Sequence, residues 1–147
     1  MKQFKLMLAL LGVSFTFLMG CKKDEGRSTT ITGINLAILK PGTLTGTFTA
    51  TGGLNTSGTH VMVIQPVGTD SIHCTWTMTA RDGTFTMIQD CLKPPGMSGR
   101  WSIISGTGHY TFLRGNGTLT MMFAPDPSVP SGALSVETNT GVVWLHP

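Results

Sequence analysis

The chain has 147 residues, a length that suits a single domain with a hydrophobic core of its own. Its formal net charge of +3 arises in the N-terminal region, because five basic and five acidic residues balance from Ser28 onward. The folded part therefore has no basic face, and we expect no nucleic-acid partner.

The first twenty residues are typical of a bacterial signal peptide. Lys2 and Lys5 precede an apolar run from Leu6 to Met19. As a helix this run would span about 21 Å, which is short of the roughly 30 Å hydrocarbon core of a membrane. Residues 1–20 are therefore predicted to be a cleaved signal segment and not a transmembrane anchor.

The cysteine after this segment has the surroundings of a lipid attachment site. Leu18-Met19-Gly20-Cys21 resembles the bacterial lipobox, in which an aliphatic residue and two small residues precede an acylated cysteine. We expect Cys21 to carry lipid such as palmitate, which would make the chain a secreted outer-membrane lipoprotein of the cell envelope. Residues 21–30 are predicted to be a flexible tether. The charged residues 22–26 resemble the surface-export signal of Bacteroidetes lipoproteins, with a merely solvated tether as the alternative.

Residues 31–147 are predicted to form one all-β domain. Threonine is abundant, and Gly and Pro interrupt the chain at intervals of about eight to twelve residues, as in sandwiches and barrels. In Thr43–Thr51 threonine alternates with apolar residues, which places the two kinds on opposite faces of a strand. Val61–Ile64, Ala133–Val136 and Val142–Leu145 predict further strands, and Pro125–Pro130 a loop. The pattern favours a closed antiparallel barrel of about eight strands, with a two-sheet sandwich as the alternative.

A first hairpin is predicted around a type I′ turn at Asp82-Gly83. This turn would place Trp76 opposite Gln89, with the indole inside the barrel, and Cys74 opposite Cys91. Cα atoms of such a non-hydrogen-bonded pair lie about 4.5 Å apart, a separation that fits a disulfide. We therefore predict a Cys74–Cys91 bridge, formed in an oxidising compartment. A zinc site is disfavoured, because two cysteines without a suitably spaced histidine supply too few ligands.

A second hairpin is predicted around Asn116-Gly117. In this register Phe112 faces Met121 and Tyr110 faces Phe123, so apolar residues meet across the ladder.

The stretch from Trp101 to Gly115 contains Gly-Thr-Gly-His-Tyr followed by Arg-Gly. It resembles the Gly-Thr-Gly-x-aromatic and Arg-Gly signature of the allene oxide cyclase and dirigent barrels, over residues 43–124. The resemblance implies an eight-stranded barrel with an apolar lumen for small hydrophobic molecules. It also implies a tight turn after Gly-Thr-Gly, which could replace the strand expected over residues 108–113. The signature residues are Gly106, Thr107, Gly108, Tyr110, Arg114 and Gly115.

Candidate site residues come from the apolar positions of these elements. They are candidates for the core first and for the lining of a ligand pocket second. The tentative ligand-binding set is Trp76, Met78, Met87, Trp101 and Tyr110.

The sequence gives less support for polar residues as site residues, and no catalytic residue is predicted. Asp82 lies in a turn and Asp90 on the outer face opposite Thr75, while nothing places Glu137 in a lumen. We expect Arg114 to cap carbonyls or pair with an acid, and His73 to lie on the surface. No metal or other cofactor is expected, because the histidines lack metal-ligand spacing. These are His60, His73, His109 and His146.

The sequence thus predicts a lipid-anchored protein that binds a small hydrophobic ligand in its barrel. A structural or interaction module of the cell surface is the alternative, and the protein partner stays open. A cofactor-free isomerase ranks last, because only the resemblance favours it.

Overall fold

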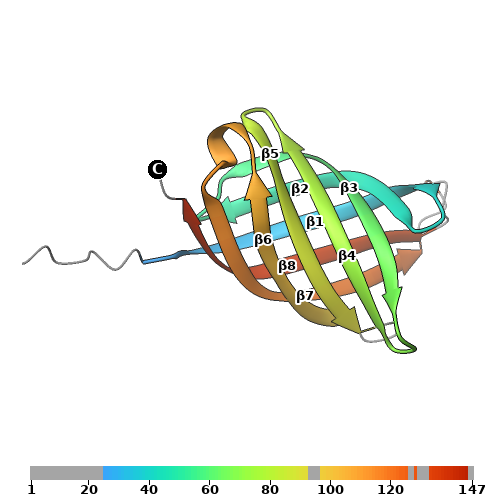
Figure 1. The fold of residues 1–147 in the computed structure, drawn as a ribbon. Helices are drawn as coiled ribbons and strands as arrows, with labels where there is room; N and C mark the ends of the chain where they lie inside the picture. The colour runs from blue at the N-terminus through green and yellow to red at the C-terminus, as the bar shows by residue number, and fades with distance from the viewer. Residues whose placement is uncertain (1–24, 93–96, 126–127, 129–132, 146–147) are drawn as a thin grey trace, which may run out of the picture.

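The computed structural model describes residues 25–92, 97–125, 128 and 133–145, so the predicted signal segment and Cys21 lie outside the described residues. The chain forms a closed antiparallel barrel in which consecutive strands pair and the last strand closes on the first (Figure 1). This confirms the all-β class and the eight-stranded barrel. The strands are β1 (Arg27–Lys40), β2 (Thr43–Gly52), β3 (Thr56–Val67), β4 (Ser71–Ala80), β5 (Gly83–Leu92), β6 (Ser98–Gly106), β7 (Leu113–Pro125) and β8 (Ala133–Leu145).

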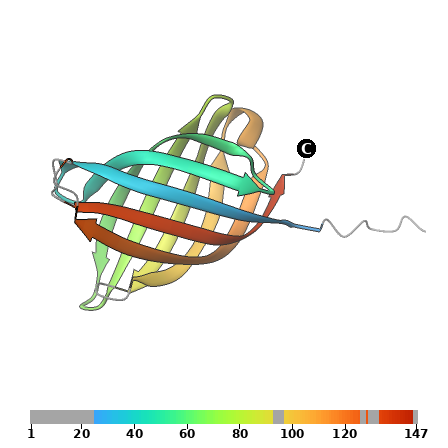
Figure 2. The same ribbon diagram turned by 180° about the vertical axis from the view of Figure 1, so that it is seen from behind.

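Two strand boundaries differ from the prediction. β1 begins at Arg27, so residues 27–30 belong to the barrel and not to the tether. The two strands expected near the C-terminus are one continuous strand, β8, which pairs with both β7 and β1 (Figure 2). The predicted loop after Pro125 lies largely outside the described residues.

The alternation of threonine and apolar residues defines the two faces of the barrel wall. In β2, Phe48 and Ala50 are buried, whereas Thr47 and Thr49 are exposed. Trp76 is fully buried as predicted, and the residues of β4 and β5 that share its face from Ile72 to Met78 and from Phe85 to Cys91 are buried as well, whereas Ala80 is only partly buried. The predicted side-chain orientation of the first hairpin is therefore correct.

The barrel has two distinct ends. At the terminal end, β1 begins and β8 ends, with Arg27 opposite Val143 in the ladder. A short 3-10 helix, η1 (Gly108–Tyr110), lies at this end. The buried hydroxyl-bearing ring of Tyr110 packs against Phe85 with ring centroids 5.3 Å apart, and its hydroxyl donates to Thr56 Oγ1 at 2.9 Å. At the distal end, β1 connects to β2, β3 to β4, β5 to β6 and β7 to β8.

The register of the first hairpin is shifted from the predicted one. Trp76 pairs with Met87 and Cys74 with Gln89, while Cys91 lies opposite Ile72. Accordingly, Asp90 lies opposite His73 and not Thr75.

The shift has a physical cause at Gly83. The loop residues are Arg81 and Asp82, and Ala80 pairs with Gly83. A type I′ turn needs positive φ at both central residues, yet no described residue other than glycine has positive φ. Gly83 serves a different purpose, because a Cβ there would lie 2.2 Å from the carbonyl oxygen of Thr107. The glycine lets the segment that leads into η1 pack on the hairpin.

The second predicted hairpin is wrong. Asn116-Gly117 lies inside β7, where Gly117 pairs with Gly141 of β8 and with Trp101 of β6. The residues that were expected before the turn form η1 instead, and Phe112 is exposed.

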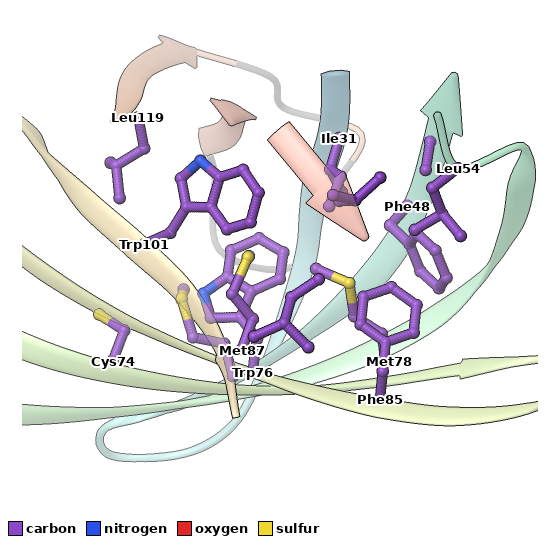
Figure 3. Close-up of a cluster of buried hydrophobic side chains, with 14 of the residues drawn as sticks. Ile31, Phe48, Leu54, Cys74, Trp76, Met78, Phe85, Met87, Trp101 and Leu119 are labelled. Carbon is purple, nitrogen blue, oxygen red and sulfur yellow. The ribbon is translucent and has the colours of Figure 1, made fainter. Parts of the chain in front are cut away.

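These strand glycines make room for a tryptophan inside the barrel. A Cβ at Gly141 would lie 2.7 Å from Trp101 Cζ2. Trp101 Nε1 donates to the carbonyl oxygens of Thr118 and Thr140 at 3.1 and 3.3 Å, which fixes the ring. Figure 3 shows Trp76 and Trp101 in the middle of the buried cluster, between Cys74 and Leu119 toward one end and Phe48 and Phe85 toward the other.

Candidate functional site

The distal half of the barrel interior contains buried polar side chains. Three of them form a chain across β3, β1 and β8. Asn35 Nδ2 donates to Ser135 Oγ at 2.8 Å, and Asn35 Oδ1 lies 2.8 Å from His60 Nε2. Because Asn35 Oδ1 can only accept, His60 Nε2 carries the proton and Nδ1 is left as an acceptor. Desolvation lowers the pKa of His60 to about 4, against the opposing effect of the Thr47 backbone. The ring is therefore neutral at physiological pH.

A second polar cluster joins β5 to β8. Gln89 Nε2 donates to Glu137 Oε1 and, at 2.9 Å, to Asn139 Oδ1. Asn139 Nδ2 in turn donates to Glu137 Oε1 at 3.0 Å and to the carbonyl oxygen of Ile31 at 3.4 Å. All three side chains are 0% exposed. We call Gln89, Glu137 and Asn139 the carboxamide–carboxyl cluster.

Glu137 is the most unusual group in this cluster. Burial raises its pKa to about 7, and the hydrogen bonds from Asn139 and Gln89 only partly oppose this shift. A carboxyl group with such a pKa can both donate and accept a proton near neutral pH. The expectation that nothing places Glu137 in the lumen is therefore wrong.

Trp76 lies beside this carboxyl group. Its indole crosses the barrel to β1, where a Cβ at Gly33 would lie 2.4 Å from Trp76 Cη2. Gly33 is the ladder partner of Glu137. The ring of His60 stacks on the indole with centroids 4.3 Å apart. Trp76 does not lie opposite Gln89 as predicted, because the register differs, and Trp76 Nε1 has no hydrogen-bond partner among the described residues.

A pocket of about 780 Å³ opens at the distal end of the barrel. Its floor contains the inward-facing residues Ile72, Cys91 and Leu119, and its rim includes the exposed Asp90 and Arg100. A volume of this size falls within the range of small-molecule sites.

The carboxamide–carboxyl cluster lies directly behind this floor. Gln89 is the next inward-facing residue after Cys91 on β5, and Leu119 pairs with Asn139 across the β7–β8 ladder. The floor of the pocket is therefore adjacent to the cluster that contains the buried carboxyl group.

The tentative ligand-binding residues are all in the interior but do not line this pocket. Trp76, Met78, Met87, Trp101 and Tyr110 are buried members of the hydrophobic core. The expectation of a wholly apolar lumen needs correction as well, because buried polar groups occupy its distal half.

The signature residues build the terminal end and not the pocket. Thr107 Oγ1 accepts from the backbone N–H of Thr84 at 3.1 Å, and Gly108 takes a positive φ of 57° at the start of η1. Gly106 passes close to the Tyr110 backbone, and Gly115 faces Trp101. Arg114 caps a carbonyl as expected, because its Nη1 donates to the oxygen of Leu113 at 2.7 Å. A tight turn is present at Gly108–Tyr110, where the resemblance implies one.

Cys74 and Cys91 are buried free cysteines in the structure, so the register that predicted their bridge is not the observed one. They occupy diagonal positions, and contact with the Cys91 thiol and burial raise the pKa of Cys74. The two sulfur atoms are therefore neighbours. The bridge itself stays a prediction.

The other two described histidines lie on the outside. His73 Nδ1 lies 2.7 Å from Asp90 Oδ1 on the outer face, and His109 is exposed beside Tyr110. His146 lies outside the described residues. Among residues 25–92, 97–125, 128 and 133–145, no group of three or more His, Cys, Asp or Glu side chains could hold a metal ion.

The buried polar residues are not predicted from the sequence, because hydrophobicity alone would place the valines of β8 inside the barrel and its polar residues outside. Its inward positions include Ser135, Glu137 and Asn139, whereas Val136 and Val142 are partly exposed. The signal that could have revealed them is the shared parity of three hydrogen-bonding side chains in one strand.

Comparison with protein-family models, with curated proteins and with solved structures finds no match to this chain. The described residues contain no helix of the length and hydropathy needed to span a membrane.

Proposed function

We propose that this protein is a lipid-anchored envelope protein whose barrel binds a small, largely apolar molecule at its distal end. The observation that carries the proposal is the distal pocket, whose floor residues Cys91 and Leu119 are neighbours of buried polar residues, and some buried polar atoms of the interior have no hydrogen-bond partner among the described residues. Ligand sites commonly combine an apolar lining with a few polar groups that fix orientation. Buried polar atoms that lack partners are unfavourable in a purely structural core, and a ligand that pairs with them would relieve that cost.

Native mass spectrometry of the purified full chain tests the proposal. We expect a co-purified small molecule whose release shifts the mass of the folded protein. The matched variant is Leu119→Trp, which fills the pocket from its floor and should abolish the adduct. Retention of the same adduct by a folded Leu119→Trp variant would place the ligand elsewhere.

The anchoring part of the proposal rests on the sequence of residues 1–21. We expect wild-type protein to partition into the detergent phase and a Cys21→Ser variant to remain in the aqueous phase. If the variant partitions like the wild type, the lipobox interpretation is wrong. The pocket would face away from the membrane, because the chain enters the barrel at the opposite, terminal end.

A further inference from the structure

The buried side chains of the barrel leave more hydrogen-bond acceptors than donors without a partner. Among the described residues four buried side-chain atoms have none: His60 Nδ1, Trp76 Nε1, Gln89 Oε1 and Glu137 Oε2. The indole Nε1 donates, whereas the other three accept when Glu137 is ionised. A molecule that satisfies this set must bring donors.

These atoms belong to side chains that gather around one point of β1. Trp76 and His60 both approach Gly33, and a Cβ there would meet them at 2.4 and 3.7 Å. Glu137 is the ladder partner of Gly33, and Gln89 donates to Glu137. The unpartnered acceptors therefore belong to β3, β5 and β8, and the side chains of His60 and Glu137 lie near the same residue of β1.

We propose that the ligand carries a primary ammonium group, which binds the carboxylate of Glu137 and the carbonyl oxygen of Gln89 while its apolar part occupies the distal pocket. This inference rests on the proposed function and names the head group that the same site would select. An ammonium group supplies three donors and no acceptor, so it can donate to the unpartnered oxygens of both Glu137 and Gln89. Its charge also compensates a buried carboxylate that forms no ion pair with any described residue.

The head group would reach Glu137 from the pocket floor. Met121 is the neighbour of Glu137 across the β7–β8 ladder and is 9% exposed. Its unbranched thioether side chain can change rotamer at low cost. An alkyl chain that follows the ammonium group would then lie against Ile72 and Leu119 in the pocket.

The titratable groups around the site set the pH at which the ammonium group binds. Glu137 has a pKa of about 7, so the carboxylate predominates at pH 8 and the neutral acid at pH 5.5. Cys74, the thiol that faces Glu137, has a raised pKa and stays neutral at both values, and His60 is neutral because its pKa is lowered to about 4. Binding of an ammonium ion should therefore strengthen as pH rises through 7.

Titration calorimetry of the full chain tests this with hexylammonium, 1-hexanol and hexanoate, which share one alkyl chain. At pH 8 we expect hexylammonium to bind at least about tenfold more tightly than the other two, as a charge-assisted hydrogen bond would give. At pH 5.5 this preference should shrink. In Glu137→Gln the preference should be lost while 1-hexanol still binds. In Asp82→Asn, which removes an exposed acid at the terminal end of the barrel, the preference should persist.

The outcomes separate this inference from the proposed function. If none of the three probes binds at any pH, the proposed function is wrong. If all three bind equally, or hexanoate binds best, the protein is a binder but the ammonium assignment is wrong. Loss of the preference in Asp82→Asn would also overturn the assignment. If Glu137→Gln fails to fold, the number of protons that the wild type releases on binding hexylammonium at pH 7 serves as the test instead. Binding of the cation to the Glu137 carboxylate should release protons, because the group is partly protonated at this pH. Binding without proton release contradicts the inference.

Discussion

At the residue scale, two buried titratable groups in this barrel have pKa shifts of opposite sign. Burial raises the pKa of Glu137 from 4.5 to about 7, whereas it lowers that of His60 from 6.5 to about 4. Between pH 4.5 and 7 the folded state binds more protons at Glu137 than the unfolded state does, so this group's contribution to stability falls as pH rises. At His60 the folded state binds fewer protons than the unfolded state between pH 4 and 6.5, so the contribution of His60 to stability rises as pH rises. The two effects nearly cancel between pH 4.5 and 6.5.

Replacing Glu137 by Gln removes the contribution of Glu137 to the pH dependence of stability and leaves that of His60. At pH 8 the variant should be more stable than the wild type by up to about 3 kcal/mol, because 1.36 kcal/mol accompanies each unit of pKa shift. At pH 4.5 the two proteins should have similar stability. Between pH 4 and 6.5 the variant should become more stable as pH rises, since only His60 then contributes. Urea denaturation across this pH range measures both effects, and a variant that is less stable than the wild type at pH 8 contradicts the raised pKa.

At the scale of the strands, the two tryptophans of the interior depend on glycines in facing strands. Trp101 extends over Gly141, and Trp76 extends over Gly33. The absence of a Cβ at these positions leaves room for the outer edge of each indole. The contact between β4 and β1 at this point therefore requires both the indole of Trp76 and a glycine at position 33.

A double-mutant cycle tests this pair. Gly33→Ala should destabilise the protein by about 1–3 kcal/mol, because the added methyl group would overlap the far edge of a fully buried indole. In a Trp76→Phe background that edge is gone, and the same substitution should be nearly neutral. The free energies of unfolding of the four proteins give the coupling. If Gly33→Ala costs the same in both backgrounds, the cost arises in the β1 backbone and not from Trp76.

At the scale of the whole molecule, the two ends of the barrel have different chemistry. The terminal end holds both chain ends, η1 and the aromatic contacts of Tyr110 with Phe85. The distal end holds the pocket and the two cysteines, and the carboxamide–carboxyl cluster lies farther inside the barrel. This division separates the proposed anchor from the proposed ligand site by the length of the barrel.

The compartment of the folded chain should determine the redox state of the cysteines. Since the thiols of Cys74 and Cys91 are neighbours, we expect an oxidising envelope to join them once the strands shift slightly, with a stabilisation of about 3 kcal/mol for a loop of this size. Mass spectrometry of a non-reduced digest should find the bridged peptide in exported protein. Chain retained in the cytoplasm, which keeps its thiols, is the control. Two free thiols in exported protein would show that the diagonal geometry prevents the bridge.

The sequence by itself determined the barrel class and the inward side of the first hairpin. These features follow from side-chain alternation, which is a local property of each strand. Phe85, Met87 and Trp76 are accordingly buried where the alternation places them.

Only the tertiary structure decided the strand register and the candidate site. A glycine after Asp or Asn can serve a turn or a close approach, and Gly83 and Gly117 serve contacts with residues distant in sequence. Glu137 becomes a site residue because β8 closes the barrel between β7 and β1 and turns its polar side inward. The free energy that selects this arrangement comes from contacts between distant strands, and no local pattern contains it.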